Sequence, residues 1–209
     1  MKSVLIFICG FITAIIVCVV GGYALFQYSS NTMEEYEDEY QSEWVPDFNE
    51  QLYKSTAELV AAKTEYKRWV AIGDVGHWNI DGGSLETAKV LAQETLRIAE
   101  KYKDDWNYGN AIHKGHLTLG RIALRLDDIE EAKKQLLLAG NTPGSAQLDS
   151  FGPNMLLAQE LLEKGENAIV LEYLKLCEIF WEFHIEKLMK WQEQVSKGEK
   201  PYFGANLIY

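Results

Sequence analysis

The chain has 209 residues, with 31 acidic and 20 basic side chains and a formal net charge of −11 at pH 7. This length suits one domain with short appendages, and the negative charge excludes general nucleic-acid binding, which needs a basic surface. Three cysteines provide no disulfide framework, and no Cys/His spacing is typical of a metal site. The sequence therefore predicts no metal and no cofactor.

Residues 4–26 form an uncharged, largely apolar run that is long enough to cross a bilayer. Lys2 precedes the run and acidic residues follow it. This charge distribution predicts a cytoplasmic N-terminus and a C-terminal domain outside the membrane, in the periplasm if the source is Gram-negative. We interpret residues 1–28 as a single-pass transmembrane anchor. Two alternatives stay open, a cleaved signal peptide and lipidation of Cys18.

Small side chains recur every four residues along this apolar run and form one stripe on a helix: Gly10, Ala14, Cys18 and Gly22. Such a stripe lets membrane helices approach closely. It is therefore a candidate contact for self-association into a homo-oligomer. The alternative is that Gly and Ala are simply common in membrane helices.

Residues 29–50 form an acidic segment, which is rich in Asp and Glu after residue 33 and contains no Lys or Arg. Repulsion between like charges extends a chain, so we interpret the segment as a solvated stalk. Aromatic residues recur in it every four positions: Tyr36, Tyr40, Trp44 and Phe48. These side chains are candidates for docking on the domain or on a partner.

The domain is predicted to begin with a helix over residues 52–72. A loop over residues 73–83 follows, because this segment is rich in Gly and Asp. His77 and Trp78 lie in this predicted loop, which makes it a candidate binding element. A second helix is predicted to begin at Ser84, its capping residue, and to bury one face at helical spacing: Ala88, Leu91, Ala92, Thr95, Ile98 and Ala99.

Residues 107–140 are predicted to form two helices packed back to back. The first has an apolar seam at helical spacing: Ile112, His116, Leu119, Ala123 and Leu126. Asp127 and Asp128 end this helix and cap the second one. Small residues predict close approach between helices: Gly115, Gly120, Ala132 and Ala139.

One residue pattern runs through both central helices: Leu119-Gly120, Ala132, Leu136 and Ala139. It resembles the tetratricopeptide repeat, which has Leu-Gly in its first helix and Ala, a large residue and Ala in its second. The resemblance implies an all-α fold over residues 51–197, with antiparallel helical hairpins stacked as a short solenoid. With the transmembrane helix, the chain resembles small bacterial membrane-anchored proteins that contain such repeats.

Residues 141–154 are predicted to form a loop, with the next helix beginning at Pro153. The last helix is predicted to be unbroken, because its apolar seam alternates steps of four and three: Val170, Leu174, Cys177, Trp181, His184, Leu188, Trp191 and Val195. Such a helix would cap the stack. Residues 198–209 form an apolar tail that either tucks into the domain or presents a patch to a partner.

A cationic stripe is predicted on one face of the first central helix: Lys114, Thr118, Arg121 and Arg125. In an acidic protein these cations would attract a carboxylate or phosphate. The resemblance implies that Lys114 and Arg121 line a concave groove. The alternatives are an ordinary solvated face and pairing with the acidic stalk.

The sequence contains four histidines. His113 and His116 lie on one predicted helix and are interpreted as interior or groove histidines, and His184 is interpreted as a core histidine. His77 lies near acids but lacks a nucleophile or a phosphate-binding loop. The sequence therefore predicts no enzyme.

The sequence predicts a membrane-anchored, tetratricopeptide-like module that binds a protein or peptide, one with an acidic end suiting the stripe, and that acts as a scaffold or assembly factor. The first alternative is a self-associating structural membrane protein. The second is a small-ligand sensor or enzyme that uses the His77 loop.

Overall fold

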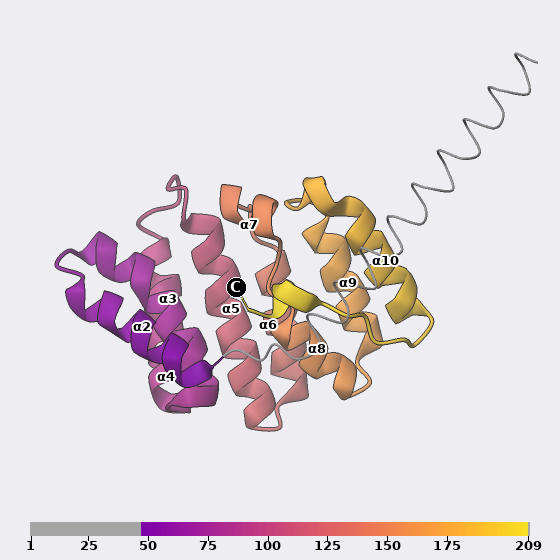
Figure 1. Ribbon diagram of the computed structural model, residues 1–209, viewed down its shortest axis with the longest axis horizontal. Helices are drawn as coiled ribbons and strands as arrows, with labels where there is room; N and C mark the ends of the chain where they lie inside the picture. The colour runs from indigo at the N-terminus through magenta and orange to yellow at the C-terminus, as the bar shows by residue number, and fades with distance from the viewer. Residues whose placement is uncertain (1–46, 209) are drawn as a thin grey trace, which may run out of the picture. The chain divides into compact units, whose positions relative to one another are not determined.

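The computed structural model describes residues 47–208, and within them every regular element is a helix (Figure 1). The predicted transmembrane anchor, its small-residue stripe and most of the acidic segment lie outside the described residues. None of the helices between residues 47 and 208 is long and apolar enough to span a bilayer. The all-α prediction is confirmed for this part of the chain.

The helices follow one another along the chain, with two short 3₁₀ helices near its end. Their bounds are α2 (Phe48–Ala61), α3 (Glu65–Gly82), α4 (Leu85–Ala99), α5 (Tyr108–Arg125), α6 (Ile129–Gly140), α7 (Ala146–Phe151), α8 (Leu156–Glu163), α9 (Asn167–Cys177), η1 (Glu182–His184), α10 (Ile185–Ser196) and η2 (Gly204–Leu207).

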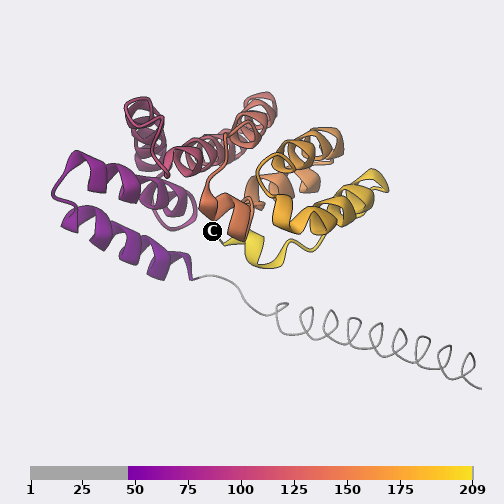
Figure 2. The same ribbon diagram turned by 90° about the horizontal axis from the view of Figure 1, so that it is seen from above.

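Successive long helices pack side by side as hairpins, so the predicted stacking is confirmed. Helix α3 packs on α2, α4 and α5, α5 packs on α6, and α6 and α10 both pack on α9. Seen from above, the hairpins follow an arc, and α7 and the C-terminal segment (residues 199–208) lie on its inner side (Figure 2). The inner side of the arc is therefore partly filled by the chain itself.

Helix α4 forms as the sequence predicts. The hydroxyl of Ser84 accepts a hydrogen bond from the N–H of Thr87 at 3.3 Å, which satisfies one free donor at the start of the helix. All six residues predicted for its inner face are buried.

The predicted loop over residues 73–83 is wrong, because these residues continue α3 to Gly82. The chain breaks earlier, where Thr64 caps α3 by accepting a hydrogen bond from the N–H of Lys67 at 3.2 Å. Gly76 is a close-contact position rather than a turn, since a Cβ there would lie 3.4 Å from the Cβ of Leu91 on α4. Gly76 therefore allows close packing of α3 against α4 and does not mark a turn.

Helix α5 is buried on most of its circumference, and the predicted single seam describes it poorly. Leu126 of that seam is 65% exposed, whereas Leu117 and Arg121 are fully buried. The reason is that α5 lies at the centre of the stack, where α3, α4 and α6 all pack against it. The predicted close approach of the two central helices at Gly120 is confirmed, because a Cβ there would lie 3.1 Å from the Cβ of Gln135 on α6; it would also overlap the side chain of Leu157 on α8.

The unbroken last helix is wrong, because α9 ends at Cys177 and α10 begins at Ile185. The seam residues on both sides of the break are nevertheless buried, from Val170 to Val195, apart from His184. The two halves of one seam therefore face each other across a hairpin. His184 is exposed beside the break, so its interpretation as an interior histidine is wrong.

The C-terminal segment packs against the domain, as one of the two interpretations of the tail predicts. Phe203 is buried against Trp191, with ring centroids 5.0 Å apart. The amide of Asn206 donates hydrogen bonds to the carbonyl oxygens of Phe151 and Pro153, both at 3.0 Å. The region 141–154 contains α7 rather than a continuous loop, and α8 begins at Leu156 rather than at Pro153.

Candidate functional site

A cavity of about 300 Å³ lies between α3, α5 and α7. Side chains one helical turn apart on α3 and on α5 form two of its walls, and α7, the turn after it and the C-terminal segment form the rest. The lining residues are Asp74, His77, Trp78, Asn110, His113, Lys114, Leu117, Gln147, Leu148, Phe151, Gly152, Asn154 and Ile208.

A second, more open hollow of about 440 Å³ lies beside the cavity, between α2, α3 and the loop before α5. Its lining residues are Glu58, Ala61, Ala62, Tyr66, Lys67, Val70, Ala71, Asp74 and Trp106. Asp74 lines both spaces, so they are neighbours along α3. We call the cavity and the hollow together the α3 groove.

Four residues that the sequence singled out meet in this groove: His77, Trp78, His113 and Lys114. His77 and Trp78 were expected in a loop and Lys114 on the cationic stripe, yet all three line the cavity. The sequence analysis missed the contribution of α7 and the turn after it, which supply Gln147 and Asn154. The cap of α7 at Ser145, whose hydroxyl accepts from the N–H of Leu148 at 3.0 Å, is the signal that could have revealed this helix.

His77 is buried in the wall of the cavity, and its Nε2 has no hydrogen-bond partner among the described residues. Its ring meets the ring of Trp78 edge to face, with centroids 4.7 Å apart. Burial lowers the pKa of His77 well below its ordinary value, and the positive charges of Arg121 and Lys114 lower it further. The imidazole is therefore neutral at pH 7.

Both ring nitrogens of His113 form hydrogen bonds within the domain. Its Nδ1 donates to the carbonyl oxygen of Ala139 at 3.0 Å, and its Nε2 accepts from the N–H of Asn154 at 3.1 Å. These partners require the neutral Nδ1–H tautomer. Burial lowers the pKa of His113 to about 4. The interior interpretation of His113 is confirmed, and the residue joins the end of α6 to the turn before α8.

Lys114 lies at the rim of the cavity, where its ammonium forms an ion pair with Asp74. Both side chains are partly exposed. Thr118, the next residue of the stripe, is buried and donates its hydroxyl hydrogen to the carbonyl oxygen of Lys114 at 2.9 Å. A ligand that enters the cavity thus meets a paired, net-neutral rim.

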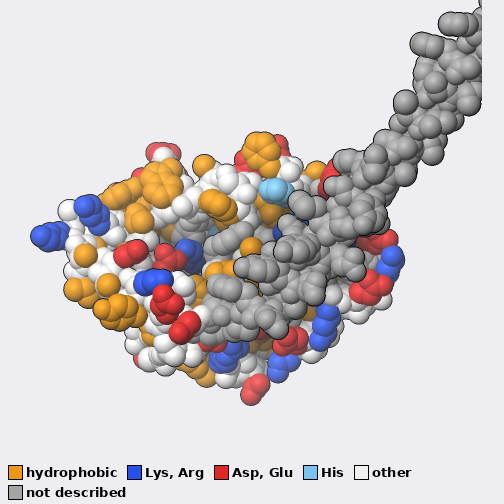
Figure 3. All heavy atoms as spheres, viewed as in Figure 1, with side chains coloured by type: hydrophobic (Ala, Val, Ile, Leu, Met, Phe, Trp, Pro, Cys, Tyr) orange, Lys and Arg blue, Asp and Glu red, His pale blue; other side chains and the backbone are white. Residues whose placement is uncertain are grey.

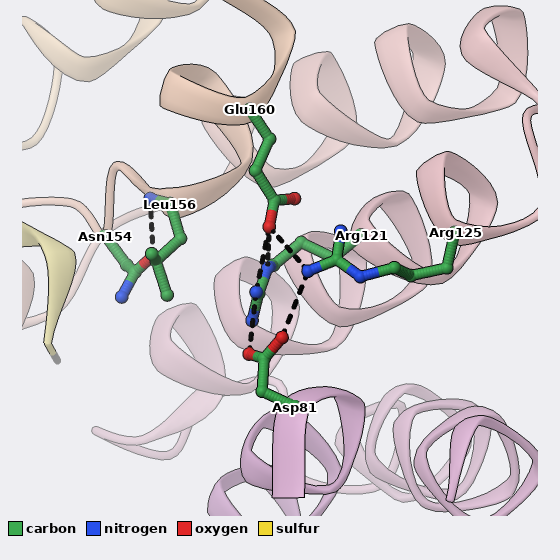
Figure 4. A network of polar contacts seen from close by, with 6 residues as sticks. All are labelled: Asp81, Arg121, Arg125, Asn154, Leu156 and Glu160. Atoms are coloured by element: carbon green, nitrogen blue, oxygen red, sulfur yellow. Dashed lines mark hydrogen bonds and ion pairs between the residues drawn. The ribbon is translucent and has the colours of Figure 1, made fainter. Parts of the chain in front are cut away.

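The other two cations of the stripe join α3, α5 and α8 in one network (Figure 4). Arg121, whose side chain is 2% exposed, donates to Asp81 at 2.7 Å and to Glu160 at 2.9 Å. Arg125 reaches the same two carboxylates at 3.0 and 2.9 Å. Acids of the domain itself therefore pair with the predicted cationic stripe.

The visible surface carries both signs of charge, with acidic and basic side chains interspersed over it (Figure 3). Among residues 47–208, no group of three His, Cys, Asp or Glu side chains is placed to hold a metal ion. What the groove offers is an apolar cavity with a few polar groups, which is typical of a binding site.

The chain was compared with protein-family models, with curated proteins and with solved structures. None of the three comparisons gives a match.

Proposed function

We propose that this chain is a membrane-anchored, tetratricopeptide-like module that binds an extended segment of a partner protein along the α3 groove, as a scaffold or assembly factor. The observation that carries the proposal is the pair of adjacent spaces that share Asp74. The groove can thus receive more than one side chain of a bound segment.

The spacing of the two spaces suits an extended chain. Val70 lines the open hollow and His77 lines the cavity, seven residues further along α3. A helix rises by about 1.5 Å per residue, so these two wall positions are roughly 10 Å apart. An extended chain covers that distance in about three residues. Two side chains of one short segment can therefore occupy both spaces.

The size of the cavity argues against a large ligand. Sites for small molecules typically measure about 300–1,000 Å³, and this cavity lies at the lower end of that range. A nucleotide or other large cofactor would exceed it, whereas one side chain would fit. A partner with an acidic end stays a prediction, while the paired rim favours contacts that do not depend on ligand charge.

The experiment is site-specific photocrosslinking of the full-length protein in its native membrane. The crosslinker replaces Lys67 in the open hollow or Gln147 at the cavity, both of which are exposed. Lys89, exposed on α4 outside both spaces, is the control position. We expect the same partner protein from both groove positions and none from Lys89.

Two outcomes would contradict the proposal. Equal yields at all three positions would show that the groove has no special role. A crosslink to a second copy of this chain would instead support the self-associating structural protein.

A further inference from the structure

The cavity between α3, α5 and α7 contains two buried polar groups whose bonding capacity is unused. Neither Nε2 of His77 nor Nδ2 of Asn154 has a hydrogen-bond partner in the described part of the chain, and each residue is 5% exposed. Both residues line the cavity. Buried polar groups are nearly always hydrogen-bonded, so two unpartnered ones among the residues that line one cavity indicate a place for a ligand atom.

The orientation of Asn154 defines the kind of atom that is needed. Its Oδ1 accepts a hydrogen bond from the N–H of Leu156 at 3.0 Å, so this oxygen is already used at the start of α8. The free end of the side chain is the NH₂ group, which only donates. The complementary ligand atom is therefore an acceptor, such as a carbonyl oxygen.

Apolar and aromatic side chains form most of the remaining wall: Trp78, Leu117, Leu148, Phe151 and Ile208. They come from α3, α5, α7 and the C-terminal segment, so an apolar group inside the cavity is enclosed from several directions. The aromatic rings of Trp78 and Phe151 can pack against another ring edge to face or offset. This part of the wall suits an aromatic group.

Charge gives no advantage to an ionised ligand. Lys114 is paired with Asp74 at the rim, and Arg121 is paired with Asp81 and Glu160. A charged group would lose its hydration on entry without finding an unpaired opposite charge. The ligand group is therefore uncharged.

Resting on the proposed function, we infer that this cavity binds one uncharged aromatic side chain of the partner segment, with an adjacent backbone carbonyl accepting a hydrogen bond from Nδ2 of Asn154. His77 lines the same cavity from α3 and, in its Nε2–H form, supplies a second donor. The partner segment is thus recognised by an aromatic anchor rather than by an acidic end.

The probes are capped amino acids, titrated into the full-length protein in nanodiscs and followed by ligand-observed NMR. N-acetyl-phenylalanine amide carries the ring and the carbonyl, N-acetyl-alanine amide lacks the ring, and N-acetyl-phenylalanine adds a carboxylate. We expect a Kd on the order of 1 mM for the first, as is usual for a ligand of this size. The other two should bind at least about 10-fold more weakly.

A matched pair of variants tests the hydrogen bond. Asn154→Asp keeps the oxygen that accepts from Leu156 but removes the NH₂ donor, and we expect it to weaken the phenylalanine probe by about 10-fold. Asn141→Asp makes the same chemical change at an exposed position and should leave binding unchanged. Partition of the probe into lipid is the same for all variants, so the comparison isolates the cavity.

Two results would overturn the inference: equal binding of the phenylalanine and alanine amides, or equal binding by the protein with and without Asn154→Asp. Crosslinking of a partner at Lys67 and Gln147 combined with either result would refute the aromatic anchor and leave the groove function standing. Probe binding without any such crosslink would leave a cavity that binds an aromatic group but would refute the partner segment along the groove, and with it the proposed function.

Discussion

Arg121 and Glu160 are joined by two hydrogen bonds that end on a single oxygen. Nε and Nη2 of Arg121 lie 3.1 and 2.9 Å from Oε1 of Glu160. Arg121 belongs to α5 and Glu160 to α8, and the same guanidinium also reaches Asp81 on α3. A buried cation thus connects three helices that are far apart in the sequence.

Removing Glu160 should destabilise the domain strongly. In Glu160→Leu, Arg121 keeps only Asp81 as a counter-charge, and breaking a buried ion pair typically costs about 3–5 kcal/mol. The free energy of unfolding, measured by urea denaturation and far-UV circular dichroism, gives this cost. The double variant Arg121→Met/Glu160→Leu should recover part of the lost stability, because the buried guanidinium is removed together with the carboxylate that pairs with it.

A surface pair provides the control for that experiment. Lys197 and Glu193 form an exposed ion pair within one helical turn. Glu193→Ala should change the stability little, because exposed ion pairs contribute little. Similar losses for Glu160→Leu and Glu193→Ala would contradict the structural role of the network.

Stability should fall between pH 7 and pH 5 because of His113. Its pKa is about 4 in the folded protein and near 6.5 in an unfolded chain. Between these values the unfolded chain binds more protons than the folded protein. The contribution of His113 to the free energy of unfolding is therefore complete above pH 6.5 and is lost as the pH falls toward 4. The loss from this residue should reach about 2 kcal/mol at pH 5.

The measurement is urea denaturation at a series of pH values. His113→Gln keeps a donor and an acceptor without a titratable ring, so its stability should depend less steeply on pH. His184→Gln, at an exposed histidine, should follow the unmodified protein. If the stability of His113→Gln depended on pH as steeply as that of the unmodified protein, the assigned role of His113 would be wrong.

Two glycine substitutions should have opposite effects. A Cβ on Gly109 would overlap the backbone carbonyl of Gly144, so Gly109→Ala should destabilise the domain by about 1–3 kcal/mol. A Cβ on Gly73 would lie 3.4 Å from the flexible side chain of Lys114. Gly73→Ala inside α3 should therefore be neutral or stabilise the domain by up to about 1 kcal/mol. Thermal unfolding of the two variants compares them directly.

Asn206 should hold the C-terminal segment in place. Asn206→Ala removes both donors to the carbonyl oxygens of Phe151 and Pro153, and loss of the buried hydrogen bond to Pro153 should cost about 1–3 kcal/mol. Hydrogen exchange should become faster over residues 199–208 while α3 and α4 stay protected. Asn141→Ala, at an exposed asparagine, is the control. Uniform loss of protection would mean that the segment does not open separately.

Features that depend only on residues close together in the sequence, within one helix, were predictable. The cap at Ser84 follows from the preference of Ser for the start of a helix, and the buried face of α4 follows from helical spacing. The C-terminal end of α3 at Gly82 was not predictable from such local features. Gly76, next to His77, is explained by its close contact with α4, which the sequence of α3 does not reveal.

The sequence singled out some of the residues that line the candidate site, but it did not predict that they lie together. His77 and Lys114 were singled out for different reasons, and only the packing of α3 against α5 brings them to one cavity. The pairing of Arg121 with Asp81 and Glu160 spans 40 and 39 residues of sequence. Spacing within one helix carries no information about such partners.

The contact between Asn206 and the turn before α8 has a consequence for biosynthesis. Pro153 leaves the ribosome 53 residues before Asn206, a delay of roughly 3–10 s at about 5–20 residues per second. During that interval the carbonyl oxygens of Phe151 and Pro153 lack the donor that they have in the finished fold. The wall of the cavity next to this turn is therefore among the last parts of the nascent domain to mature.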